Sequence, residues 1–99
     1  MSLLVHYTLK SAADHDAQTA AMEALVAGLV AEAVAGVHYS CFGTGDPTAF
    51  VGLLEFDTDA GKDAFLKSKA FAAYRDKVGP TFANPPQTTA ITAIASTRG

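Results

Sequence analysis

The chain has 99 residues, enough for one domain with a modest core, because a chain of this length buries only about 60–65% of the surface that its unfolded state exposes. Hydrophobic residues make up 49% of it and charged residues 17%, and the formal net charge of −3 argues against the basic surface that nucleic-acid binding requires. The sequence has no 18-residue apolar run and no signal-peptide pattern, so we expect a cytoplasmic protein without a membrane contact.

The hydrophobic pattern predicts six elements in chain order. Strands are expected at residues 3–9, 37–42, 48–56 and 88–96, with an alanine-rich helix between residues 11 and 36 and a helical region at residues 59–78. This βαββαβ order indicates an α+β, ferredoxin-like fold with a four-stranded antiparallel sheet. We expect residues 1–99 to form one domain.

Capping residues divide the helical part of the chain. Gly36 is a natural end for the first helix. In the second helical region, Thr58 or Asp59 can cap a first segment, and Ser68 can cap a new one whose buried stripe includes Phe71. We therefore expect a break near residue 68. The cations of this region are interpreted as a solvent-facing surface: Lys67, Lys69, Arg75 and Lys77.

The third expected strand is apolar on both of its faces. Ala49, Val51 and Leu53 alternate there with Phe50, Leu54 and Phe56. In a βαββαβ fold both helices cover one face of the sheet, and the other face would normally turn polar. An apolar second face indicates a protein contact, and the simplest cover is a second copy of the chain. We expect a homodimer, which an Asp at whichever of Val51 or Leu54 faces the partner should break.

Histidines and aromatic residues are the candidate functional groups. His6 and His38 are candidate general bases, since imidazole titrates near neutral pH. Tyr7, Tyr39 and Tyr74 could each place a hydroxyl in a pocket. The phenylalanines that could line a cavity for an aromatic ligand are Phe65, Phe71 and Phe82. For each of these residues the alternative interpretation is core or interface packing.

Several stretches of the chain together resemble the antibiotic biosynthesis monooxygenase family, whose members are dimeric α+β barrels. They are residues 5–10 (Val-His-Tyr-Thr-Leu-Lys), 36–39 (Gly-Val-His-Tyr), 50–57, and 67–74 with the spacing Ser68-x-x-Phe71-x-x-Tyr74. The resemblance implies a barrel formed by two copies, with a cavity between sheet and helices in each. It also implies that Tyr74 orients a substrate, because Ser68, Phe71 and Tyr74 are the most family-like residues.

The activity implied by this resemblance is cofactor-independent oxidation of a small aromatic or polyketide-like substrate. His6 or His38 would act as the base, Tyr74 as substrate orienter, and the substrate would contact Tyr7, Phe65, Phe71 and Phe82. We expect no metal, because the three histidines are scattered. The resemblance also implies no haem, because the family's tryptophan and first-strand asparagine are missing here: the sequence has no tryptophan, and its single asparagine is Asn84. Tyr74→Phe is expected to weaken binding or turnover and to leave thermal stability nearly intact.

Two other functions fit the same fold. One is a non-catalytic dimer that binds a small ligand in the same cavity. The other is a stress-responsive dimeric α/β barrel, a group whose first strand also carries a histidine followed by apolar residues and a lysine, as at His6 and Lys10.

Overall fold

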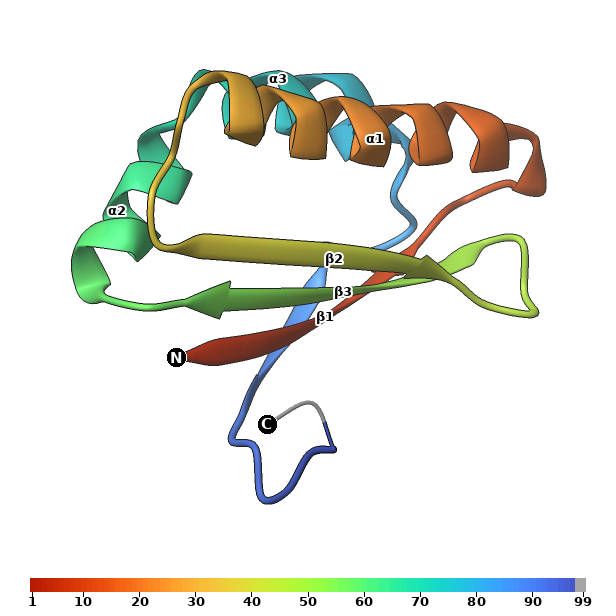
Figure 1. Ribbon diagram of the computed structural model, residues 1–99. Coiled ribbons are helices and arrows are strands. Elements are labelled where there is room, and N and C mark those ends of the chain that lie inside the picture. The colour runs from red at the N-terminus through yellow and green to blue at the C-terminus, as the bar shows by residue number, and fades with distance from the viewer. Residues whose placement is uncertain (98–99) are drawn as a thin grey trace.

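The computed structural model describes residues 1–97 and contains one sheet covered on one side by helices (Figure 1). The elements are β1 (Ser2–Thr8), α1 (His15–Ala31), β2 (Val37–Gly43), β3 (Ala49–Phe56), α2 (Asp59–Lys67), α3 (Lys69–Val78) and β4 (Gln87–Ile91), with 3-10 turns η1 (Ala12–Asp14) and η2 (Gly79–Thr81). The sheet order is β2-β3-β1-β4, and all neighbouring strands are antiparallel. The predicted ferredoxin-like α+β fold is confirmed, and in the single chain the sheet is open rather than closed into a barrel.

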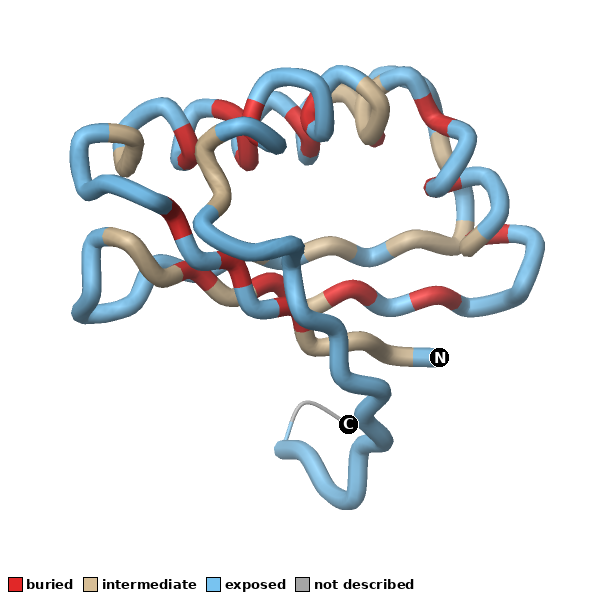
Figure 2. The backbone as a smooth tube through the Cα atoms, turned by 180° about the vertical axis from the view of Figure 1, so that it is seen from behind, coloured by how far each residue is buried: buried red, intermediate tan, exposed pale blue. Residues whose placement is uncertain are grey.

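The register of the sheet assigns each strand residue to one of two faces. Val5 and Tyr7 of β1 pair with Gly52 and Phe50 of β3, and their side chains form the core under the helices. In Figure 2 the buried parts of the helices and strands face each other across this layer. The opposite face carries a second apolar set, which is Leu4, Phe42, Val51, Leu53 and Ile91. The two-sided apolar pattern predicted for residues 48–56 is therefore present.

The last strand is shorter than predicted. It was expected to extend to residue 96 but ends at Ile91, and Ile94 is 100% exposed. The reason lies in its partner, because Ile91 pairs with Ser2, the first residue of β1. The ladder between β1 and β4 ends at this pair, and residues 92–96 are not part of a strand.

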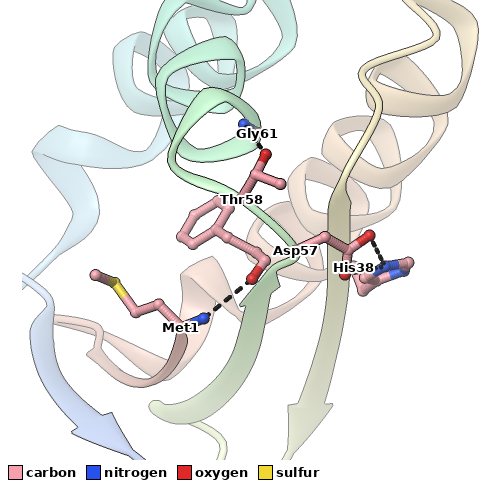
Figure 3. Close-up of polar contacts among 6 residues, drawn as sticks. Met1, His38, Asp57, Thr58 and Gly61 are labelled. Carbon is pink, nitrogen blue, oxygen red and sulfur yellow. Dashed lines mark hydrogen bonds and ion pairs between the residues drawn. The ribbon is translucent and has the colours of Figure 1, made fainter.

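The predicted break in the second helical region is confirmed at Ser68. Its backbone is extended (ψ 147°), its hydroxyl donates to the Phe65 carbonyl at 2.7 Å, and its oxygen accepts from the Phe71 amide at 3.2 Å. At the start of α2, Thr58 rather than Asp59 supplies the cap, accepting from the Gly61 amide at 3.1 Å (Figure 3). The bend that follows positions α3 against α1 and leaves α2 beside the end of the sheet (Figure 1).

A carboxylate from α1 completes the start of α3. The two Glu32 oxygens accept from the amides of Lys69 and Ala70 at 2.9 and 2.8 Å. Free amides at a helix N-terminus favour a negative charge, so this pair of bonds stabilises α3 as well as its contact with α1. The two helices also approach closely, since a Cβ at Gly28 would lie 2.7 Å from the Ala70 Cβ.

We expect Gly61→Ala to destabilise the protein although alanine is the better helix former. A Cβ at Gly61 would lie 2.7 Å from the carbonyl oxygen of Gly36, and backbone atoms cannot yield as a side chain can. The expected loss is about 1–3 kcal/mol of unfolding free energy, measured by urea denaturation. Gly45→Ala is the control, because a Cβ there meets nothing within 4 Å apart from its chain neighbours. Equal stability of the two variants would contradict this account.

Candidate functional site

A cavity of about 610 Å³ lies between the helix-facing side of the sheet, α2, α3 and the segment that leads into β4. Its walls are mostly apolar and aromatic. The predicted ligand-contact residues all line it: Tyr7, Phe65, Phe71, Tyr74 and Phe82. The proline-rich segment of residues 84–86 forms part of one wall. A volume of this size suits a small organic molecule.

Aromatic rings pack against each other around this space. Phe65 and Phe71 have ring centroids 4.6 Å apart, which joins α2 to α3 across the break at Ser68. The Tyr7 ring meets the Tyr74 ring edge to face at 6.3 Å and lies 5.7 Å from the Phe82 ring. The walls therefore present both ring faces and ring edges, which suits a flat aromatic ligand.

Three tyrosines line the cavity, and their hydroxyls are held in hydrogen bonds. The Tyr7 and Tyr39 hydroxyl oxygens form a hydrogen bond of 2.9 Å, and the Gln18 side-chain amide donates to the Tyr74 hydroxyl at 2.8 Å. Gln18 is only 1% exposed. Its Oε1 has no hydrogen-bond partner among the residues described, which is unusual for a buried acceptor. Gln18 lies four residues before Met22 on the buried stripe of α1, so helical periodicity could have placed it in the interior. Tyr39 was identified only as one of three tyrosines.

Burial raises the pKa of all three tyrosines. For Tyr39 and Tyr74 desolvation is the largest cause and the neighbouring Tyr7 adds to it. For Tyr7 the pKa increase from desolvation outweighs the decrease from its hydrogen bond with Tyr39. The hydroxyls therefore stay protonated at neutral pH. They can donate to a ligand oxygen, but they are poor general bases.

This arrangement predicts a specific alkaline transition. Because the folded-state pKa of each tyrosine lies above its unfolded value of about 10, the unfolded chain loses these protons first as the pH rises. Stability contributed by these groups is fully present below pH ~10 and falls above it. Tyrosinate absorbance at 295 nm should therefore rise together with the loss of helical circular dichroism. Ionisation of any of the three tyrosines in the still-folded protein would contradict it.

The two candidate histidines lie away from this cavity. His6 is exposed on the open face, where it pairs across the strands with Val51 and Gln87. His38 is on the same face, and its Nε2 lies 3.1 Å from both carboxylate oxygens of Asp57 (Figure 3). Thus the structure does not bring His6 or His38 together with Tyr74. The lining residues among those described include no histidine, aspartate or glutamate.

Two cations that the sequence did not connect with a ligand site, Lys62 and Arg75, line the cavity. Lys62 of α2 is half-buried there, and Arg75 of α3 lies with its guanidinium carbon 4.8 Å from the centre of the Phe71 ring. Arg75 had been interpreted as part of a solvent-facing surface. It is exposed, but its guanidinium also covers the cavity aromatic one helical turn before it.

Residues 1–97 hold no group of three His, Cys, Asp or Glu side chains arranged to bind a metal ion. Within the same residues, no helix has the length and apolar character needed to cross a bilayer. The cytoplasmic location and the single-domain extent remain predictions.

Comparison with solved structures identifies the fold. A structure from Nitrosomonas europaea, provisionally named an antibiotic biosynthesis monooxygenase, matches with a TM-score of 0.80 at 18% identity, covering 94% of this chain and 88% of that one. A second, from Caulobacter crescentus and named in the same provisional way, gives 0.80 at 16% identity over 95% and 89% of the two chains. The chain has the antibiotic biosynthesis monooxygenase fold. A scan against protein-family models and a search of curated proteins found no match to this sequence.

A further solved antibiotic biosynthesis monooxygenase matches with a TM-score of 0.79 at 16% identity and covers 95% of this chain and 98% of that one. This fold therefore extends over nearly the whole chain. At these identities the match establishes the arrangement of the backbone. The lining of the cavity has to be interpreted from this chain's own residues.

Proposed function

We propose that this protein binds a small aromatic molecule in the cavity between the sheet and the helices. The observation that carries the proposal is the cavity itself, about 610 Å³ in volume and lined by Tyr7, Phe65, Phe71, Tyr74 and Phe82. Burying apolar ligand surface there contributes roughly 25 cal/mol per Å². The hydroxyls then select a ligand with an oxygen on its ring.

The test uses 2-naphthol as a neutral, hydroxylated aromatic probe. Isothermal titration calorimetry should show saturable one-to-one binding, and nuclear Overhauser effects should connect the naphthol ring to the rings of Phe65 and Phe71. Ala83→Trp, which adds an indole to the cavity wall, should weaken binding, whereas Ala64→Trp on the exposed side of α2 should not. Absence of saturable heat at about 1 mM probe, or contacts to another surface, would refute the proposal.

A second candidate function is cofactor-free oxygenation of the bound aromatic, which the names of the matching structures favour. In such a reaction a substrate SH₂ and O₂ give SO and water, so the substrate supplies all the electrons. The activated species is the substrate anion, and the Tyr7 and Tyr74 hydroxyls would donate hydrogen bonds to its oxygen. Since the described lining offers no imidazole or carboxylate base, the substrate would have to ionise by itself.

This second function predicts oxygen uptake that rises with pH up to the pKa of the substrate. An oxygen electrode and a panel of quinols with different pKa values would measure it, with the heat-denatured protein as control. If the rate follows His6→Ala or His38→Ala instead, the base lies on the open face and the cavity is not the reaction site. If no quinol consumes oxygen above the control rate, only the binding function stands.

We also propose that the open face of the sheet packs against the same face of a second copy. Its support is the apolar set on that face, in which Phe42 is 52% and Ile91 37% exposed. Burying such apolar side chains is favourable, and a symmetric contact between the same faces of two copies is the commonest way to bury them. Such a pair would place two open sheets face to face, as in the predicted dimeric barrel.

A further inference from the structure

We propose that the ligand of the cavity is an aromatic anion, a ring that carries a carboxylate, and that Lys62 and Arg75 bind the carboxylate at the rim while the ring lies against Phe65 and Phe71. This proposal rests on the binding function proposed above and names its ligand class. It predicts that the carboxylate end of the ligand remains near solvent and that the ring is buried, because Arg75 is exposed whereas Phe65 is buried.

The first support is the distribution of charge. The chain has ten acidic and seven basic residues, yet among the described residues that line the cavity only two are charged, and both are cations. They come from different helices, Lys62 from α2 and Arg75 from α3. The acidic residues of these two helices, Asp59, Asp63 and Asp76, are not part of the lining. An anion at the rim would thus meet attraction without a neighbouring carboxylate to oppose it.

The second support is the orientation of Arg75. Its guanidinium carbon lies 4.8 Å from the centre of the Phe71 ring, so the exposed side chain lies over the cavity aromatic. A planar guanidinium in that position offers a fork of donors that matches the two oxygens of a carboxylate. Lys62 adds a second positive charge from a half-buried position. A ring with a directly attached carboxylate satisfies both the apolar wall and the cationic rim.

The experiment compares two probes of nearly equal shape, 2-naphthoate and the neutral 2-naphthamide, by calorimetry at pH 7. We expect naphthoate to bind about tenfold more tightly, the equivalent of one charge-assisted hydrogen bond. Arg75→Gln and Lys62→Gln should each reduce this ratio towards one, and Arg75→Lys should retain part of it. Lys77→Gln on α3 and Lys67→Gln on α2 are matched controls, since they remove the same charge from exposed positions outside this cavity.

The outcomes separate the two proposals. If both probes bind equally, the anion proposal fails and the cavity proposal stands. If the control variants lower the ratio as much as Arg75→Gln does, the preference comes from the overall charge of the protein and the site proposal fails. If neither naphthoate, naphthamide nor 2-naphthol binds, both proposals fail. Circular dichroism of each variant establishes that a lost preference is not a lost fold.

Discussion

Val51→Asp should convert the proposed dimer into a monomer without unfolding it. Val51 lies on the open face of β3, so the carboxylate of an aspartate at this position would be buried only when a second copy covers that face. An uncompensated buried charge costs about 3–5 kcal/mol, enough to raise the dissociation constant more than a hundredfold. Equilibrium sedimentation at micromolar concentration measures the change. Unmodified protein that sediments as a monomer would overturn the dimer itself.

Two companion variants make this test specific. His6 pairs directly with Val51 across the sheet, and a protonated histidine could compensate an aspartate there. Leu53→Asp avoids this, because its cross-strand neighbours are Leu4 and Ser40. Leu54→Asp is the opposite control. Leu54 belongs to the core under the helices, so this substitution should unfold the chain. The sequence left open which of Val51 and Leu54 faces outward, and the register shows that Val51 does.

Tyr74→Phe should reduce both stability and ligand binding. The Tyr74 hydroxyl accepts a hydrogen bond from Gln18 Nε2, and Gln18 Oε1 has no partner among the described residues. The variant therefore leaves both Nε2 and Oε1 of the buried Gln18 without a hydrogen bond. The expected loss is about 1–3 kcal/mol of unfolding free energy. This revises the expectation, made from the sequence, that stability would remain nearly intact. Thermal unfolding and 2-naphthol titration of the same variant measure the two effects.

A double variant separates the effect of the Tyr74 hydroxyl on stability from its effect on ligand binding. Replacing both partners, as in Gln18→Met with Tyr74→Phe, removes the unpaired amide and should recover much of the stability. It should not recover 2-naphthol binding if the Tyr74 hydroxyl contacts the ligand. Tyr39→Phe serves as a comparison, because its half-buried hydroxyl bonds only to Tyr7 in the structure and its loss should cost less. If Tyr74→Phe binds 2-naphthol as the unmodified protein does, the hydroxyl has no role in recognition.

The fold was largely predictable because its signals are local. The alternation of apolar residues marks the strands, and a single serine at position 68 marks the break between α2 and α3 through its own hydrogen bonds. The end of β4 was not predictable in the same way. Residues 92–96 have strand-like character, but the length of a strand also depends on its pairing with a neighbour, and the pairing of β4 with β1 ends at Ile91.

The site was predictable where it depends on periodicity and not where it depends on tertiary contacts. Phe71 and Tyr74 follow from the buried stripe of a helix, and the structure places both in the cavity wall. Gln18 follows the buried periodicity of α1, but its bond to Tyr74 depends on tertiary contacts that no sequence pattern shows, and so does the place of Lys62 in the cavity wall. The position of His6 was readable after all, because it alternates with the core residues Val5 and Tyr7 and must therefore face the opposite side of the sheet.

The bonds from Glu32 to the start of α3 have a consequence for how the cavity forms. Glu32 is separated from Lys69 and Ala70 by 37 and 38 positions, and a helix of ten residues has little stability by itself in water. The acceptor for the first amides of α3 is thus in place only after the end of α1 has docked. Local opening at that end would release the Lys69 and Ala70 amide protons to hydrogen exchange and would loosen the wall that carries Phe71 and Arg75. Local opening of the cavity wall is in this way coupled to the C-terminal end of α1.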